Sequence, residues 1–100
     1  MADTIPLLSP YNITDHLMRA ELYREIRNGD SSWAQYTIGP DEILFPELIA
    51  HRYYGTRNLK WVVMISAKLD SPREPLEAGE TILLPPATWI RQRIKHYQGR

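Results

Sequence analysis

Pro46-Glu-Leu-Ile-Ala-His-Arg-Tyr-Tyr-Gly55 is the stretch of sequence on which the expected fold depends most. Proline suits the first position of a helix, where an N–H group would have no helical partner, and glycine suits the left-handed residue that ends one. Between these two residues, Ile49 and Tyr53 fall on one helical face, with Ala50 beside them. The decapeptide therefore predicts a short amphipathic helix with a defined start and end.

A second helix and two short strands are expected around this decapeptide. Asn58 can cap a helix over the apolar run 59–65, although the valines in that run leave a buried strand as the alternative. Strand-forming residues occupy 33–38, and a second short strand over 81–84 is followed by two prolines. We therefore expect an α+β fold with a βααβ core, in which a two-stranded antiparallel sheet packs on two helices.

The segment before the first strand has two possible structures. Apolar residues recur at every fourth position over 14–27, which predicts a helix that Thr14 or Asn12 caps and that ends at Asn28-Gly29. The alternative is a hairpin in which a strand over 22–27 turns at the same Asn-Gly pair, a strong hairpin signal between two apolar runs. The sequence leaves both structures open.

The first twelve residues are expected to form an arm. Their two prolines disfavour regular structure, yet four bulky residues, Ile5, Leu7, Leu8 and Tyr11, are unusual for a free solvated segment. The arm can pack on the chain's own core or dock on a neighbouring subunit, and the sequence favours neither.

A C-terminal helix is predicted over 87–97. Ile90, Ile94 and Tyr97 recur at helical spacing, and Trp89 is adjacent to them. Three cations make the segment basic, which complements the dipole at the end of a helix. The alternative use of these charges is contact with the acidic face of another subunit.

One hundred residues are enough for one domain with short extensions. The expected organisation is an N-terminal arm and extension over 1–35, a core over 36–86, and a helical tail over 87–100.

Composition argues against several classes of partner. Twelve Lys and Arg balance twelve Asp and Glu, so no field of one sign indicates a nucleic acid or a membrane. The absence of cysteine excludes disulfides and cysteine-based zinc sites, and it is consistent with a reducing compartment. The start lacks the features of a signal peptide, and the longest apolar run, 61–65, is too short to span a bilayer. We expect a cytoplasmic chain, unless it leaves the cell inside a larger particle.

No set of residues has the pattern of a catalytic or metal site. His16, His51 and His96 are scattered, without the spacing of metal ligands. The pair Asp41-Glu42 is better explained as a helix cap than as an acid–base pair, and no phosphate-binding Gly-rich loop occurs. We therefore predict no enzyme activity, no metal and no cofactor.

Six short pieces of the chain, taken in order, resemble a LysM domain. They are Tyr36-Thr-Ile38, Ile49-Ala-x-x-Tyr-Tyr-Gly55, Leu59-x-Trp61, Leu69-Asp-Ser-Pro72, Leu76-x-x-Gly79 and Ile82-x-Leu84-Pro85. Within this set, the sequence Leu59-Lys-Trp-Val-Val-Met-Ile65, with Pro46-Glu47 and Tyr54-Gly55, is most similar to LysM-like baseplate wedge proteins of contractile-tailed phages. The resemblance implies a LysM-type core and a structural role in the tail of a virion assembled in the host cytoplasm. It further implies other baseplate proteins as partners and no enzyme activity.

Two departures from the LysM pattern concern sugar binding. The pattern has Asn near the end of the second helix, where this chain has Ala67-Lys68. Glycan-binding members carry a polar, Gly-rich turn after the first strand, whereas this chain has Ile43, Leu44 and Phe45 there. Both departures argue against peptidoglycan binding and leave the expected LysM-like fold unchanged.

These considerations predict a protein interface and leave one alternative function. The predicted interface residues are Ile5, Leu7, Leu8, Tyr11, Ile43, Leu44, Phe45, Trp89, Ile90, Ile94 and Tyr97. The alternative is a module that binds peptidoglycan or chitin-type glycans in a groove between the first turn and residues 69–77, with Trp33 or Tyr36 as an aromatic platform.

Overall fold

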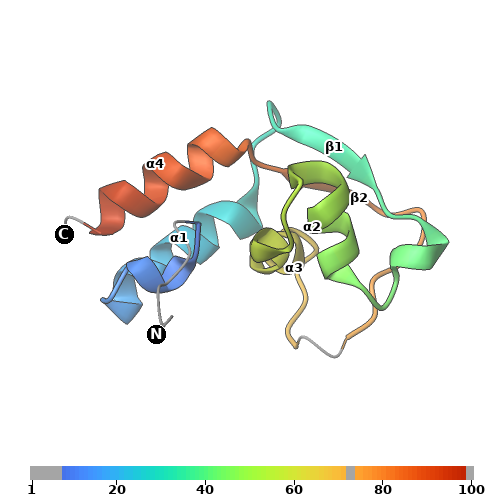
Figure 1. Cartoon of the computed structure of the whole chain (residues 1–100), viewed down its shortest axis with the longest axis horizontal. Helices are drawn as coiled ribbons and strands as arrows, with labels where there is room; N and C mark the ends of the chain where they lie inside the picture. The colour runs from blue at the N-terminus through green and yellow to red at the C-terminus, as the bar shows by residue number, and fades with distance from the viewer. Residues whose placement is uncertain (1–7, 72–73, 99–100) are drawn as a thin grey trace.

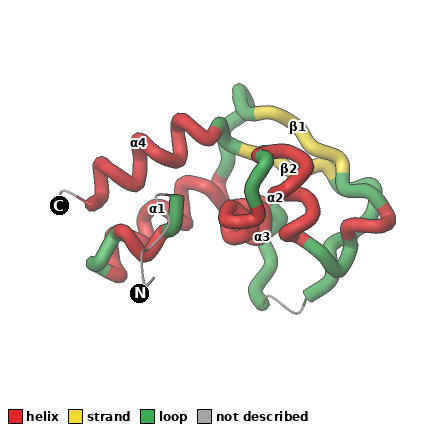
Figure 2. Tube along the Cα trace, in the orientation of Figure 1, coloured by secondary structure: helices red, strands yellow, loops and turns green. Residues whose placement is uncertain are grey.

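The computed structural model describes residues 8–71 and 74–98 (Figure 1). Its elements, in chain order, are η1 (Pro10–Asn12), α1 (His16–Asn28), β1 (Ala34–Thr37), η2 (Pro40–Glu42), α2 (Pro46–Tyr54), η3 (Arg57–Leu59), α3 (Lys60–Ser66), β2 (Thr81–Leu84) and α4 (Ala87–Gln98), where η marks a 3-10 helix. The described residues thus form a small α+β structure with four α-helices and a two-stranded antiparallel sheet (Figure 2). None of the helices in these ranges is long and apolar enough to cross a lipid bilayer.

The segment before the sheet is a helix, so the hairpin alternative is wrong. β1 pairs with β2 instead, with Ala34 opposite Leu84 and Thr37 opposite Thr81. Gly29 ends α1 with a φ of 74°, as the Asn-Gly pair predicted. The cap at the start is Asp15, rather than the predicted Thr14 or Asn12, because its carboxylate accepts the Leu17 N–H at 2.8 Å.

The second helix of the core starts differently from the prediction. Asn58 lies inside η3, and the Thr56 hydroxyl caps that turn by accepting the Asn58 N–H at 3.2 Å. The turn continues directly into α3, which is helical, so the strand alternative for this run is wrong. The preceding helix, α2, has the predicted limits: Pro46 is its first residue, and Gly55 ends it in the left-handed conformation, with a φ of 79°.

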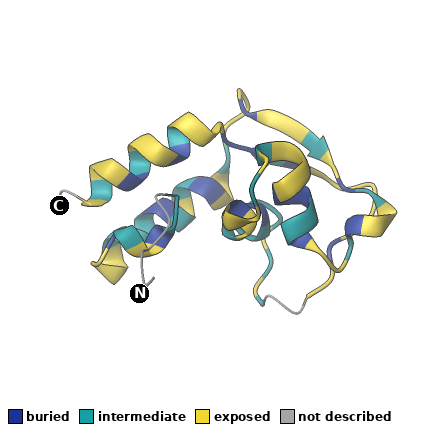
Figure 3. Ribbon diagram, in the orientation of Figure 1, coloured by how far each residue is buried: buried dark blue, intermediate teal, exposed yellow. Residues whose placement is uncertain are grey.

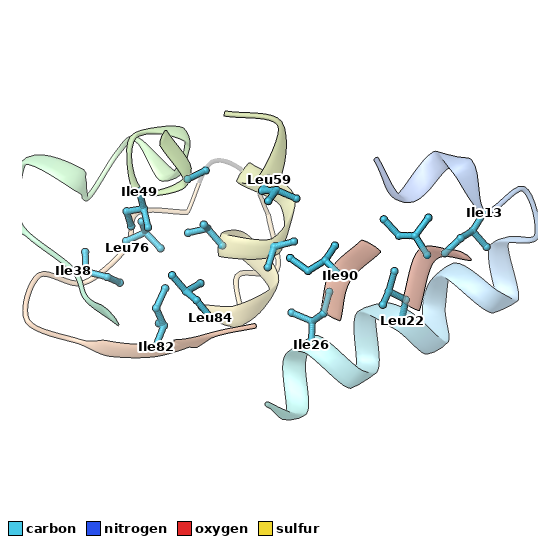
Figure 4. Packing of buried hydrophobic residues seen from close by; sticks show 14 residues of the cluster. Ile13, Leu22, Ile26, Ile38, Ile49, Leu59, Leu76, Ile82, Leu84 and Ile90 are labelled. Atoms are coloured by element: carbon cyan, nitrogen blue, oxygen red, sulfur yellow. The ribbon is translucent and has the colours of Figure 1, made fainter. Parts of the chain in front are cut away.

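α3 lies at the centre of the molecule, where it contacts α1, α2 and β2. α1 and α4 pack on each other beside this core, which places the N-terminal and C-terminal segments together (Figure 1). One hydrophobic cluster runs through both parts: Figure 4 shows Ile38 and Ile13 near its two ends, with Ile26 and Ile90 between them. The segments 1–35, 36–86 and 87–100 therefore all contribute residues to one continuous core.

Aromatic contacts join the ends of the chain to the core. Trp33, before β1, packs edge-on against Trp89 of α4, with ring centroids 4.8 Å apart. The Trp61 indole N–H donates to the carbonyl oxygen of Leu8 at 3.0 Å, and its ring packs against Tyr23 of α1. These contacts attach both extensions to the core.

Two of the predicted interface residues on α4 are core residues. Ile90 is 0% exposed and Ile94 is 2% exposed, because the apolar stripe of α4 faces Leu22 and Ile26 of α1 within the same cluster. Tyr97 is half-buried, and its hydroxyl donates to Glu25 of α1 at 2.7 Å. The prediction that Ile90 and Ile94 face a partner is therefore corrected.

Candidate protein-interaction surface

The remaining predicted interface residues fall into two groups: those that precede α1 or belong to α4, and those in the turn between η2 and α2. Ile5 and Leu7 lie outside the described residues. Leu8 is half-buried, and Tyr11 is exposed with the Arg19 guanidinium 5.1 Å from the centre of its ring. Trp89 is half-buried against Trp33. The other group, residues 43–45, lies far from these along the chain and forms the turn between η2 and α2.

Leu44 and Phe45 are the most notable residues of this turn because their large apolar side chains are exposed. Leu44 is 68% exposed and Phe45 is 52% exposed, whereas Ile43 is half-buried. Figure 3 shows burial along the described residues, with exposed residues in yellow. Single exposed apolar residues are common on protein surfaces, so exposure alone does not indicate an interface. The way in which the turn is held distinguishes this pair.

A polar cluster beneath the turn fixes its conformation. The carboxylate of Glu42, a residue only 1% exposed, accepts the Gly39 N–H at 2.7 Å and an Arg52 guanidinium N–H at 2.9 Å. The Tyr36 hydroxyl also donates to Glu42. Arg52, from α2, reaches Asp41 as well, at 2.7 Å. The cluster therefore connects β1, η2 and α2 through one buried carboxylate.

The protonation behaviour of these groups reflects this geometry. Burial raises the pKa of Glu42, but hydrogen bonds from Tyr36, Gly39 and Arg52 outweigh burial and hold that pKa below its usual value. Burial and the hydrogen bond to Glu42 raise the pKa of Tyr36 to about 12. The hydrogen bond from Arg52 lowers the pKa of Asp41. The cluster is therefore ionised near neutral pH, with Tyr36 as a donor.

Main-chain hydrogen bonds hold the turn from its other side. The Ile43 carbonyl accepts the Leu76 N–H at 2.8 Å. Ile38 exchanges hydrogen bonds with the turn before β2, donating its N–H to Glu80 at 2.9 Å and accepting that of Gly79 at 2.8 Å. Hydrogen bonds therefore anchor both flanks of the turn that presents Leu44 and Phe45 to solvent.

A shallow hollow adjoins the exposed pair. It has a volume of about 310 Å³ and is lined by Phe45, Glu47, Leu48 and Arg57. The hollow combines the apolar side chains of Phe45 and Leu48 with the charged side chains of Glu47 and Arg57. Aromatic and Arg side chains are enriched at protein interfaces. We call Leu44, Phe45 and this hollow the turn surface.

The two aromatic residues expected to form a sugar platform are already engaged. Trp33 is buried against Trp89. Tyr36 is half-buried, its hydroxyl bonds Glu42, and its ring packs edge-on against Tyr53 at 6.1 Å. Neither residue presents a free ring of the kind a sugar-binding groove requires.

No group of three or more His, Cys, Asp or Glu in the described ranges could hold a metal ion. The sequence predicts a cap at Asp41-Glu42 but gives no indication of the contacts that Glu42 makes with Tyr36 and Arg52. A local signal for Glu42 exists: it follows Gly39 by three residues, the spacing at which a Glu side chain bonds back to the N-cap N–H. Arg52 has no comparable signal, because it reaches the turn only through the orientation of α2.

No protein-family model, curated protein or solved structure matches this chain. The roles of Leu44, Phe45 and Glu42 therefore have to be inferred from their own geometry and chemistry.

Proposed function

We propose that this chain is a non-enzymatic structural subunit of a contractile phage tail baseplate, which joins neighbouring subunits through a LysM-like core and its extensions. The chain would take its place in the virion after assembly in the host cytoplasm. The order β1, α2, α3, β2 is compatible with the βααβ layout of LysM domains. The assignment to phage tails rests on the sequence resemblance of residues 36–86, and the assembly role rests also on the turn surface.

The observation that carries the proposal is the exposure of Leu44 and Phe45 on a turn that is anchored from both sides. Fully burying a Leu or Phe side chain stabilises a complex by about 1.5–3 kcal/mol. Because hydrogen bonds hold both flanks of the turn, we expect a partner to gain this burial with little loss of backbone entropy. The same anchoring disfavours the open, polar turn that a sugar ligand would need.

The proposal is tested by the double substitution Leu44→Ser/Phe45→Ser in the full chain. We expect the variant to stay folded with no loss of stability greater than about 0.5 kcal/mol, since neither side chain belongs to the core. A serine in place of Phe45 can also cap α2, because this position precedes the first residue of that helix. Incorporation into tail particles, measured by complementation of a phage that lacks the gene, should be lost. The matched control is Leu17→Ser, which removes an exposed leucine from α1. Normal incorporation of the double variant would contradict the proposal.

Glycan binding is the competing function, and it is separable in solution. Titration of the full chain with chitin oligomers to millimolar concentration should leave the backbone resonances of residues 39–45 unchanged. Saturable shifts confined to those residues would favour the glycan module over the baseplate subunit.

A further inference from the structure

A second surface lies between α4 and the segment that leads into α1. Two hollows follow each other along α4: one of about 240 Å³, lined by Leu8, Ala87, Thr88 and Arg91, and one of about 190 Å³, lined by Asn12, Arg91, Ile94, Lys95 and Gln98. They share Arg91, and the lining of each is more apolar than polar. We call this pair of hollows the α4 groove.

Among the described residues that line the α4 groove, both charged side chains, Arg91 and Lys95, are positive. Arg91 and Lys95 are exposed and, among the described residues, have no carboxylate within ion-pair distance. Arg93, on the other side of the helix, is different: its guanidinium pairs with Glu25 at 2.9 Å and donates to the Tyr97 hydroxyl. α4 contains no acidic residue, although the chain as a whole is neutral. The groove is therefore a local positive region on a neutral protein.

The helix dipole explains only part of this pattern. Lys95 lies in the last turn of α4, where a cation is favoured. Arg91 lies in the second turn, beyond the reach of the C-terminal dipole, and it repels Lys95 four residues later on the same face. A carboxylate placed between the two cations would remove this repulsion and complete the charge pattern.

We propose that the α4 groove binds an amphipathic, carboxylate-rich segment of a neighbouring protein subunit. Apolar side chains of that segment would fill the hollows beside Leu8 and Ile94, and its carboxylates would pair with Arg91 and Lys95. The proposal deepens the proposed assembly function and rests on it for the identity of the partner as a subunit.

The position of the α4 groove gives this interface a separate role. In Figure 1, α4 and η1 occupy one end of the molecule, and the turn between η2 and α2 lies at the other end. The α4 groove and the turn surface can therefore engage two different neighbours at once. The chain would act as a bridge, with a charged contact at one end and an apolar contact at the other.

The direct test is a titration of the isotope-labelled full chain with a synthetic peptide in which Leu and Glu recur at helical spacing. We expect saturable shifts of backbone resonances in residues 8–12 and at Thr88, Arg91 and Lys95. The variant Arg91→Glu/Lys95→Glu should weaken binding at least roughly tenfold, and raising the salt from about 0.05 M to about 0.5 M should weaken binding to the unsubstituted chain. A peptide with Lys in place of Glu should not bind.

Two further variants keep the test decisive. Lys60→Glu/Lys68→Glu makes the same change of charge on exposed lysines outside the α4 groove and should leave peptide binding intact. Arg91→Gln/Lys95→Gln removes the two charges without reversing them and should give an intermediate loss. An equal loss in the control and the groove variants, or no shift at millimolar peptide, would overturn the proposal. Because the titration is done without tail particles, its failure leaves the turn surface and the incorporation assay unaffected.

A basic groove can also bind a nucleic acid, and duplex DNA is the probe for this alternative. We expect it to give no shifts at α4 at physiological salt, because two cations form too small a phosphate-binding surface. Shifts with DNA that Arg91→Glu/Lys95→Glu abolishes, without shifts from the acidic peptide, would replace the protein partner by a nucleic acid.

Discussion

The two ends of the molecule are built in opposite ways. At the turn between η2 and α2, the carboxylate of Glu42 is buried and the apolar Leu44 and Phe45 are exposed. Where α1 meets α4, Ile90 is buried and Arg91 is exposed. An apolar residue in an extension, such as Ile90, is therefore not by itself evidence of an interface. A charged residue, such as Glu42, is not by itself evidence of a solvated surface.

The difference follows from the local backbone. A helix places residues three or four apart on one face, so α4 can bury Ile90 and Ile94 together against α1. A tight turn directs consecutive side chains to different sides, so residues 43–45 cannot all enter the core. Ile43 is half-buried at the anchored side, and Leu44 and Phe45 are left outside.

The largest expected effect is the loss of stability when a buried side chain of α4 is shortened. Ile90→Ala should lower the free energy of unfolding by about 3–4 kcal/mol, because it leaves a cavity between α4 and α1. The matched variant Leu44→Ala should change it by less than about 0.5 kcal/mol. Chemical denaturation measures the free energy of unfolding of both variants. Similar losses of stability in the two would contradict the difference between the two ends of the molecule.

A smaller effect is expected from the buried carboxylate under the turn. Glu42→Gln keeps the shape of the side chain but removes the charge that three donors share, and it should cost about 1–3 kcal/mol at neutral pH.

The pH dependence of the same variant gives an internal check. The pKa of Glu42 is lowered in the folded state, so its stabilisation is present above the unfolded pKa of about 4.3 and is lost as the pH falls through the folded value. The difference in stability between the natural chain and Glu42→Gln should therefore shrink on acidification below about pH 4. A difference that stays constant from neutral to acidic pH would mean that the Glu42 charge does not hold the turn.

The smallest effect concerns the end of α3, which belongs to neither surface. Lys68 has a φ of 60°, and the Leu69 N–H and Lys68 N–H donate to the carbonyls of Met64 and Ile65. This is the hydrogen-bond pattern of a helix end at which glycine is favoured.

Replacing Lys68 by Gly should therefore stabilise the fold by about 0.5–1 kcal/mol, as seen in a thermal melt. Lys68→Ala removes the same charge without relieving the backbone and should give no gain. Equal stabilities for Lys68→Gly and the natural chain would show that the left-handed residue carries no strain.

Local signals in the sequence were sufficient for most of the secondary structure. Pro46 and Gly55 mark the limits of α2, and two prolines end β2, because each of these residues restricts its own backbone. The start of α1 was misplaced by a residue or more, since Asn12, Thr14 and Asp15 are all able to cap a helix and only the tertiary context selects Asp15.

The candidate site was less accessible to sequence reasoning. Leu44 and Phe45 were predicted at an interface, because three large apolar residues stand where glycan-binding LysM domains have a polar turn. The structure shows that both side chains are exposed, and their contact with a partner stays a prediction. The burial of Ile90 and Ile94 could not be decided, since the same spacing serves a core helix and a docking helix. Arg52 was missed because its contact with Glu42 spans ten residues and depends on how α2 packs.

Hydroxyl-radical footprinting of the chain, free and within assembled tails, tests the central claim most directly. Leu44 and Phe45 should be labelled in the free chain and protected in the particle, because in the proposed assembly a neighbouring subunit covers the turn surface. Ile90 should stay unlabelled in both states, since the chain's own core already covers it. Equal labelling of Leu44 and Phe45 in the free and assembled states would contradict the account.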